Sequence, residues 1–404
     1  MLGLVLAVLA AGAGAARPRA PAAPSIAGPR STSATAPVYR FKAARAVGFR
    51  CAFDSRRLHK CAARYSQRLT VGAHVLRAQA VGKGGRTSRV VAVRITIVPP
   101  SPELPTLPLA ATVAVGRGPG APAVGAGAAW VPNTDDGTLS RVDATTNTVA
   151  ATIRYAPARP AGETGEFYDS AAFGHGSVWV ASDQRGLVAR VDPATNQVTA
   201  TIPVAQRPAE ITVTSDAVWV AHFLQSVATR IDPVTNAKTE KQLTGAPMTG
   251  AAGDGSTIWL LVNQPQTLIH LGSDGHEIAH ADVTPSASIK RGFLSAWWLA
   301  VGEGGVWATH PNQDVVTRTD PATTAVTATV PVAPGRLFGV AAGGGSVWAV
   351  TDEAVVRIDP ATNHAVAKAP FTRATPIGFT GVAVGAGAVW ATNYDRAELY
   401  RVNS

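Results

Sequence analysis

Short runs of alternating apolar and polar residues fill the C-terminal three quarters of the chain. The stretches 186–192 (GLVARVD) and 197–204 (QVTATIPV) alternate in this way and are rich in β-branched residues. Such alternation is typical of strands with one buried face. Turn residues such as Asp, Pro, Gly and Asn separate the runs. The pattern therefore predicts an all-β chain of short strands.

This pattern repeats along the sequence. Tryptophans recur in a common frame at spacings of 49, 40, 40, 48, 41 and 42 residues: Trp130, Trp179, Trp219, Trp259, Trp307, Trp348 and Trp390. In five of the first six repeats an Asp-led turn follows: Asp143, Asp192, Asp232, Asp320 and Asp359. Each repeat contains four short strands, which we name a to d. A repeat of this length with four strands is typical of one β-propeller blade.

The two ends of the repeat region predict how the ring closes. Residues 111–115 (ATVAV) precede the first tryptophan unit and look like a d-strand. Residues 398–402 (ELYRV) look like a c-strand, after which the sequence ends. Pairing of these two segments would complete a seventh blade and leave no free sheet edge. We therefore predict a seven-bladed β-propeller over residues 109–404.

The repeat motif V-W-V…V-x-R-[IV]-D-P-x-T-N-x-V-x-x-T-I-x-V resembles the YVTN-repeat, YncE-like propellers of exported bacterial proteins. It is also similar to the streptogramin lyase-like propellers. The first resemblance would permit nucleic-acid binding, and the second implies catalytic His and Glu residues at the top of the ring. At the matching strand starts this chain reads RPAEI (207–211), APMTG (246–250) and PIGFT (376–380), without the His and Glu motifs of the lyases. The resemblance is specific for fold and weak for function.

The N-terminal quarter divides into four predicted segments. Residues 1–16 are apolar and end in an A-x-A pattern, so we expect a signal peptide and a secreted or cell-surface location, with an uncleaved anchor as the alternative. Residues 17–37 read as a Pro/Ala-rich tether, 38–98 as a small β module, and 99–108 as a Pro-rich linker. Cys51 and Cys61 fit export, and we expect them to form a disulfide in an oxidising compartment, with two buried free thiols as the alternative.

The module at 38–98 resembles the immunoglobulin-like modules of exported bacterial proteins, which implies a small β-sandwich. The residues that carry this resemblance are Phe49, Cys51, Asp54, Cys61, Leu69, Gly72, His74, Ala80 and Gly85. This module departs from those relatives in its many outward Lys and Arg residues.

Charge separates the two parts of the chain. The net charge of +10 combines +16 in residues 1–100, where Asp54 is the one acid, with −6 in residues 101–404. The mildly acidic propeller argues against nucleic acid as its partner. The basic module is a candidate to bind an anionic cell-surface polymer or lipid headgroups, and a merely solvated basic face is the alternative.

One motif points to metal chemistry. Residues 276–280 read His-Glu-Ile-Ala-His, which matches the H-E-x-x-H motif of zinc peptidases. That motif needs a helix, whereas this segment falls on a predicted d-strand, where residues four apart lie about 13 Å apart. We therefore predict a structural strand, no metal site and no cofactor.

A candidate binding face follows from the loop that succeeds each tryptophan strand. Six of the seven residues three positions after the tryptophans are polar, and the long d–a connections 156–171 and 283–297 add aromatic residues such as Phe167, Tyr168 and Phe293, with Phe379 in an equivalent connection. Either a solvated rim or a ligand site would explain this. The candidate residues are Asn133, Ser182, Asp183, Arg185, His222, Gln264, Trp297, His310, Phe338, Thr351, Asn393 and Tyr394.

These observations favour a monomeric, non-enzymatic recognition or scaffold protein. Its ligand would be a peptide, a glycan or a small polar molecule on that face. The alternatives are a lyase-like or hydrolytic enzyme that uses His222 or His310 in the central funnel, and YncE-like nucleic-acid binding.

Overall fold

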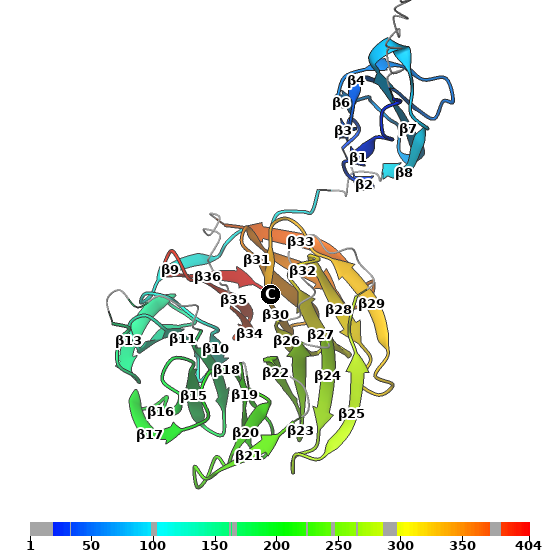
Figure 1. The fold of residues 1–404 in the computed structure, drawn as a ribbon. Coiled ribbons are helices and arrows are strands. Elements are labelled where there is room, and N and C mark those ends of the chain that lie inside the picture. The colour runs from blue at the N-terminus through cyan, green and yellow to red at the C-terminus, as the bar shows by residue number, and fades with distance from the viewer. Residues whose placement is uncertain are drawn as a thin grey trace, which may run out of the picture. The chain divides into compact units, whose positions relative to one another are not determined.

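The structure, a computed structural model, divides into two units, Met1–Glu103 and Leu104–Ser404 (Figure 1). It describes residues 19–404 except 33, 98–102, 161–162, 164–167, 224, 244–246, 264–265, 286–296 and 372–380. The expected signal peptide at 1–16 lies outside the described residues. The prediction of an all-β chain is confirmed, because strands and one short 3₁₀ turn (η1, Lys83–Gly85) make up the regular structure that is described. No helix within these limits is long and apolar enough to cross a membrane.

The first unit contains two sheets. The three-stranded sheet has the order β1 (Ser25–Ala27), β3 (Val38–Lys42) and β6 (Arg64–Ser66). The five-stranded sheet has the order β2 (Ser31–Thr32), β8 (Val91–Ile97), β7 (Gly72–Gly82), β4 (Ala46–Phe53) and β5 (His59–Cys61). One apolar core joins both sheets, with Tyr39 and Phe41 from β3 packed together with Phe49, Leu76 and Ile95.

One sequence-based boundary of this unit needs correction, whereas the predicted disulfide is present. The segment predicted as a tether contains β1, which pairs with β3, and β2, which pairs in parallel with β8. The ordered unit therefore begins before residue 38. Cys51 in β4 and Cys61 in β5 form a disulfide, so the alternative of two free thiols is wrong.

The second unit consists of seven four-stranded antiparallel sheets. The first is β10 (Ala123–Gly125), β11 (Ala128–Asn133), β12 (Thr138–Asp143) and β13 (Thr148–Arg154). The second is β14 (Ser170–Gly174), β15 (Ser177–Ser182), β16 (Leu187–Asp192) and β17 (Gln197–Pro203). The third is β18 (Pro208–Val213), β19 (Val218–His222), β20 (Val227–Ile231) and β21 (Lys238–Gln242). The fourth is β22 (Met248–Asp254), β23 (Thr257–Asn263), β24 (Gln266–Leu271) and β25 (Glu277–Asp282).

The last three sheets follow the same meander. The fifth is β26 (Leu299–Gly302), β27 (Gly305–His310), β28 (Val315–Thr319) and β29 (Val326–Pro331). The sixth is β30 (Leu337–Gly343), β31 (Ser346–Thr351), β32 (Ala354–Asp359) and β33 (His364–Pro370). The seventh is β34 (Val382–Gly385), β35 (Ala388–Asn393), β36 (Glu398–Asn403) and β9 (Ala111–Ala114), so its outer strand comes from the start of the unit.

The first strand of each sheet faces the centre of the unit. These inner strands contact one another in succession from β10 to β34, and β34 in turn contacts β10. The sheets thus radiate around a common axis (Figure 1). The seven tryptophans of the sequence repeat are all buried in the second strands, where they pack between neighbouring sheets.

Arginine side chains connect five pairs of neighbouring sheets, through Arg141, Arg190, Arg230, Arg318 and Arg401. Arg318 stacks over Trp307 of its own sheet and donates to the Asn363 side chain in the following sheet. Asn363 has a φ of 56°, a left-handed conformation that Asn tolerates well, which explains its place at the end of the D-P-A-T-N turn. Arg401 of the last sheet makes the same contact with Asn147 of the first sheet, at 2.9 Å.

The predicted linker at 99–108 also needs correction at its C-terminal end. Leu107 donates its backbone N–H to the carbonyl of Lys368 in β33, and Thr106 forms a parallel bridge with the same residue. Leu104 and Leu107 pack against the apolar cores of the neighbouring sheets. Residues 104–107 are therefore part of the second unit.

The H-E-x-x-H segment is a strand, as predicted. Glu277–Asp282 is β25, the outer strand of the fourth sheet. His280 bonds to the Glu277 carboxylate at 3.0 Å, and His276 contacts Asp274 in the preceding turn. Both imidazoles are largely exposed and contact acids of their own strand or turn.

Candidate functional site

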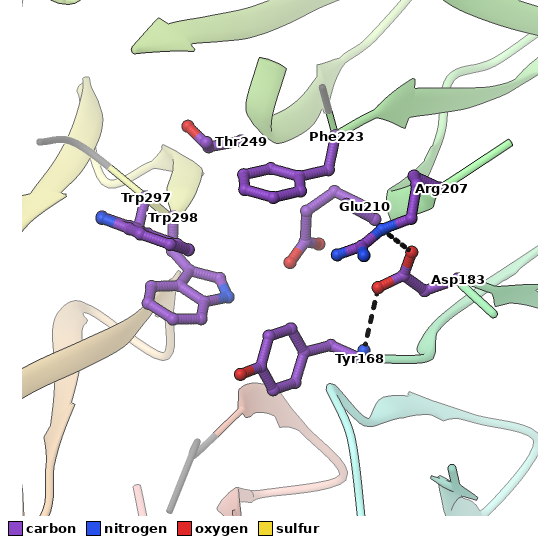
Figure 2. Close-up of a pocket in the computed structure, with 9 residues that line it drawn as sticks. Tyr168, Asp183, Arg207, Glu210, Phe223, Thr249, Trp297 and Trp298 are labelled. Carbon is purple, nitrogen blue, oxygen red and sulfur yellow. Dashed lines mark hydrogen bonds and ion pairs between the residues drawn. The ribbon is translucent and has the colours of Figure 1, made fainter. Parts of the chain in front are cut away.

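A small cavity of about 80 Å³ opens where the inner strands of the second to fifth sheets begin. Four aromatic side chains line it, and two carboxyl groups and one guanidinium lie among them (Figure 2). The lining residues are Tyr168, Asp183, Arg207, Ala209, Glu210, Phe223, Thr249, Trp297 and Trp298.

Backbone irregularity places two of these residues. The register of β18 against β19 shifts between Pro208 and Glu210, which leaves Ala209 as a bulge. In the neighbouring sheet the same shift occurs between Met248 and Gly250, with Thr249 as the bulged residue. Bulges bend a strand and redirect its side chains. Both bulged residues line the cavity.

Glu210 is the central polar group of the site. Its carboxyl group points into the space between Tyr168, Phe223 and Trp298 (Figure 2). Burial raises the pKa of Glu210 to about 8, although a hydrogen bond from the Trp298 side chain acts in the opposite direction. Among the described residues, no cation contributes to this pKa. Glu210 is therefore largely protonated at neutral pH and can donate a hydrogen bond.

Asp183 and Arg207 form the charged side of the cavity. Nε of Arg207 lies 2.7 Å from Oδ1 of Asp183, which is almost fully buried. The backbone N–H of Tyr168 donates to the other carboxylate oxygen at 3.2 Å. Burial raises the pKa of Asp183 to about 6, while Arg207 limits this rise. The Arg207 guanidinium also lies over the Phe223 ring, 5.2 Å from its centre.

A second buried acid lies behind Asp183. Burial raises the pKa of Asp169 to about 7, in spite of hydrogen bonds from the Tyr155 hydroxyl and the Asp183 backbone N–H. Asp169 lines a smaller cavity together with Glu210 and Trp298. Three carboxyl groups with raised pKa values thus line this cavity and the smaller one that shares Glu210 with it.

An aromatic row borders the cavity. Phe223 stacks on Trp297 with ring centres 6.0 Å apart, and Trp297 stacks on Trp298 at 5.9 Å. Phe338 of the sixth sheet meets Trp298 edge-on at 6.2 Å. Such faces attract apolar groups and cations.

The structure brings together a small part of the predicted site. Asp183 and Trp297 line the cavity, Ser182 donates to Asp169 behind it, and Phe338 extends the aromatic row. Gln264 lies outside the described residues, as do Phe167, Phe293 and Phe379. Tyr394 donates to Asp135 at 2.9 Å, and Arg185 donates to the Ala158 carbonyl at 3.0 Å, both away from the cavity lining.

The polar residues after the tryptophans have another role. His222 bonds to Thr229, His310 bonds to Thr317 and the Gln266 side chain, and burial lowers the pKa of His310 to about 3. The interpretation of these positions as a solvated rim is wrong, because their side chains are buried and hydrogen-bonded to other residues of the second unit. The residues concerned are Asn133, Ser182, His222, His310, Thr351 and Asn393.

Sequence reasoning missed six residues that line the cavity: Arg207, Ala209, Glu210, Phe223, Thr249 and Trp298. One signal in the sequence was the glutamate of RPAEI, because acidic residues are rarely buried on inner strands unless they are paired. The described residues contain no cluster of three or more His, Cys, Asp or Glu side chains placed to hold a metal ion.

Comparisons with known proteins identify the fold class. No family model matches the chain, and no curated protein matches its sequence. Among solved structures, it is similar to a streptogramin B lyase, with a TM-score of 0.58 and 14% identity over 74% of this chain and 97% of the lyase. It is also similar to hydrazine synthase of Kuenenia stuttgartiensis, with a TM-score of 0.58 and 14% identity over 76% of this chain and 98% of that one.

A third similar structure is the WD40 β-propeller domain of Doa1, with a TM-score of 0.57 and 12% identity over 74% of this chain and 96% of that domain. The chain is thus an all-β protein with a β-propeller fold. At these identities the similarity establishes fold and no activity.

Proposed function

We propose that the protein is an exported recognition protein that binds an organic cation, such as an alkylammonium group of a small molecule or peptide, at the Glu210 cavity. In this proposal the seven sheets are the blades of a closed seven-bladed propeller, completed by β9. The first unit is an immunoglobulin-like module. The Cys51–Cys61 disulfide is compatible with a location outside the cytoplasm.

The observation that carries the proposal is the position of the Glu210 carboxyl group among aromatic rings. Ionising a buried carboxyl group without a partner costs free energy, and a bound cation offsets that cost. The faces of Phe223, Tyr168 and the tryptophans add cation–π attraction, which strengthens where water is excluded. Asp183 is already paired with Arg207, so Glu210 is the acid available to the ligand.

A second candidate function is acid–base catalysis at the same cavity. A carboxyl group with a pKa near 8 can donate and accept a proton at neutral pH. The buried positions and lowered pKa values of His222 and His310 argue against the two histidines as the catalytic groups. Catalysis would therefore depend on Glu210, with Asp183 as the nearest second acid in the cavity.

A matched ligand pair tests the binding proposal. Calorimetry and tryptophan fluorescence would compare 2-phenylethylamine with 2-phenylethanol, which has nearly the same shape without the charge. We expect the amine to bind at least about tenfold more tightly, because only its ammonium group can pair with the Glu210 carboxylate and lie over the ring faces. Below pH 8, binding should release protons from Glu210, seen as a dependence of the heat on the buffer.

Glu210→Gln should abolish the proton release and reduce the preference for the amine to what the aromatic rings alone supply, whereas the exposed control Glu277→Gln should keep both. Equal binding of amine and alcohol, or an unchanged preference in Glu210→Gln, would contradict the proposal. Ligand recovered unchanged by mass spectrometry favours recognition, and a product that forms in the wild type but not in Glu210→Gln favours the enzyme.

A further inference from the structure

The first unit carries an unusual excess of positive charge. Between residues 19 and 97 there are 16 Lys and Arg residues, and Asp54 is the one acid. The Asp54 carboxylate is already engaged, because it lies 2.6 Å from Nδ1 of His74 and accepts the Val75 backbone N–H at 2.7 Å. The surface cations of this unit therefore have almost no internal counter-charge.

Strand register places some of these cations directly opposite each other. Arg50 of β4 is the cross-strand partner of Lys60 of β5, and both side chains are exposed. In the other sheet, Arg40 of β3 is the partner of Arg64 of β6, and again both are exposed. Like charges directly opposite in a sheet destabilise it. Both sheets of the unit thus contain a pair of like charges whose repulsion a bound external anion would reduce.

The chemistry of the cations indicates the anion. Between residues 38 and 97, 11 of the 14 basic residues are Arg. The planar guanidinium binds phosphate oxygens through two parallel hydrogen bonds, which a lysine ammonium cannot do. Arg94 on β8 and Arg77 on β7 extend the Arg50–Lys60 face across the sheet. A repeating phosphate ligand therefore fits this surface better than a single anion.

Two further features identify the kind of phosphate polymer. The Arg40–Arg64 and Arg50–Lys60 pairs lie on the outer sides of two sheets that share the core between them, so a planar bilayer cannot contact both. A flexible chain can wrap around both sides. Tyr39, Phe41, Phe49 and Phe53 are buried in that core, which leaves them unable to stack on nucleic-acid bases.

We propose that the first unit binds a linear polymer of phosphodiester-linked polyols through these two faces. The binding should depend strongly on salt, because each neutralised phosphate releases counterions. This inference is independent of the ligand proposed for the Glu210 cavity, and it gives the first unit the role of an anchor on an anionic polymer.

The test uses the full-length protein and poly(glycerol phosphate), with single-stranded DNA and phosphatidylglycerol vesicles as competing probes. We expect Arg50→Gln with Lys60→Gln, and separately Arg40→Gln with Arg64→Gln, each to weaken polymer binding about tenfold at low salt and to reduce the salt slope by about 1.4. The control pair Lys238→Gln with Lys241→Gln, on an exposed strand of the second unit, should change binding less than about twofold.

Folding is monitored by thermal unfolding, which the neutralised pairs should leave unchanged or raise, since they remove repulsion. An equal loss in the control pair would overturn the proposal. Tighter binding to vesicles, with one of the two faces sufficient, would overturn it in favour of a membrane. Tighter binding to DNA would overturn it in favour of nucleic acid.

Discussion

The Arg207 guanidinium holds the buried Asp183 carboxylate across the boundary between two sheets. Nε and Oδ1 lie 2.7 Å apart, with Asp183 in the loop after β15 and Arg207 in the loop before β18. Asp183 is 2% exposed at its side chain and Arg207 28%. A buried ion pair that loses one partner leaves the other charge uncompensated, so this contact controls both the stability and the shape of the cavity wall.

Arg207→Gln should therefore destabilise the protein at neutral pH. We expect the free energy of unfolding to fall by about 1–3 kcal/mol, less than for a fully buried pair because Arg207 is partly solvated. At pH 5 the loss should shrink, since Asp183 without its cation is then protonated. Guanidinium unfolding at the two pH values measures this. A loss of the same size at pH 5 and pH 7.5, or a similar loss in the exposed control Lys241→Gln, would contradict the argument.

The three acids with raised pKa values predict an alkaline weakening of the fold. In the folded protein, the pKa of Glu210 is about 8, of Asp169 about 7 and of Asp183 about 6, all above their unfolded values. Between about pH 4 and 8 the folded state therefore binds more protons than the unfolded state, so stability decreases as pH rises.

Glu210→Gln removes one of these groups without changing its size. We expect the variant to gain about 1–3 kcal/mol of stability relative to the wild type at pH 8.5 and little at pH 4.5. The measurement is chemical unfolding across this pH range. A variant that is equally destabilised at both pH values would show that the glutamate carboxyl is needed for structure and that its burial carries no ionisation cost.

The all-β fold was predictable because its signals are local. The alternation of a strand, the residues around each tryptophan and the Asp-led turn are each readable within a few residues. The structure has sheets at the predicted positions. The N-terminal boundaries were not predictable in the same way. β1 and β2 have three and two residues, and their partners are decided by register with distant strands. The segment 104–107 similarly depends on Lys368 for its pairing.

The cavity could not be predicted from the sequence, because it depends on contacts between residues of different sheets. Glu210 enters the cavity because β18 is bulged, and its environment comes from Trp298 of another sheet. By contrast, the polar residues after the tryptophans were recognised in the sequence, but their side chains are buried and form hydrogen bonds inside the second unit. His222 and His310 each bond to a threonine on the next strand of their own sheet, a pattern that looks the same in sequence as a polar rim.

The pair Asp54–His74 predicts a pH optimum for the first unit. Hydrogen bonds to Asp54 and to the Thr70 carbonyl raise the pKa of His74. Burial opposes ionisation of Asp54, but hydrogen bonds from His74 and Val75 outweigh it and lower its pKa. The contribution of His74 is fully present below about pH 6.5 and is lost as pH rises through its folded pKa. The contribution of Asp54 is lost as pH falls below about 3.9.

Hydrogen exchange of peptides from β4 and β7 should therefore show greatest protection between about pH 4 and 6.5, after correction for the intrinsic exchange rate. His74→Gln should remove the decline on the alkaline side, and the exposed control His59→Gln should keep it. Protection that stays constant from pH 5 to 8 in the wild type would contradict this coupling.

The contact between Arg401 and Asn147 tests whether the ring of sheets is closed, as we propose. Arg401 stacks over Trp390 and donates to Asn147 at 2.9 Å, as Arg318 stacks over Trp307 and donates to Asn363. In a closed ring the two contacts are equivalent, although one joins residues far apart in sequence.

Arg401→Gln and Arg318→Gln should then each cost about 1–3 kcal/mol of unfolding free energy, from a lost charged hydrogen bond and a lost cation–π contact. Equilibrium unfolding in guanidinium compares them directly. If the first and last sheets separate readily in solution, Arg401→Gln will cost much less than Arg318→Gln, and that difference would show that the ring is open at this position.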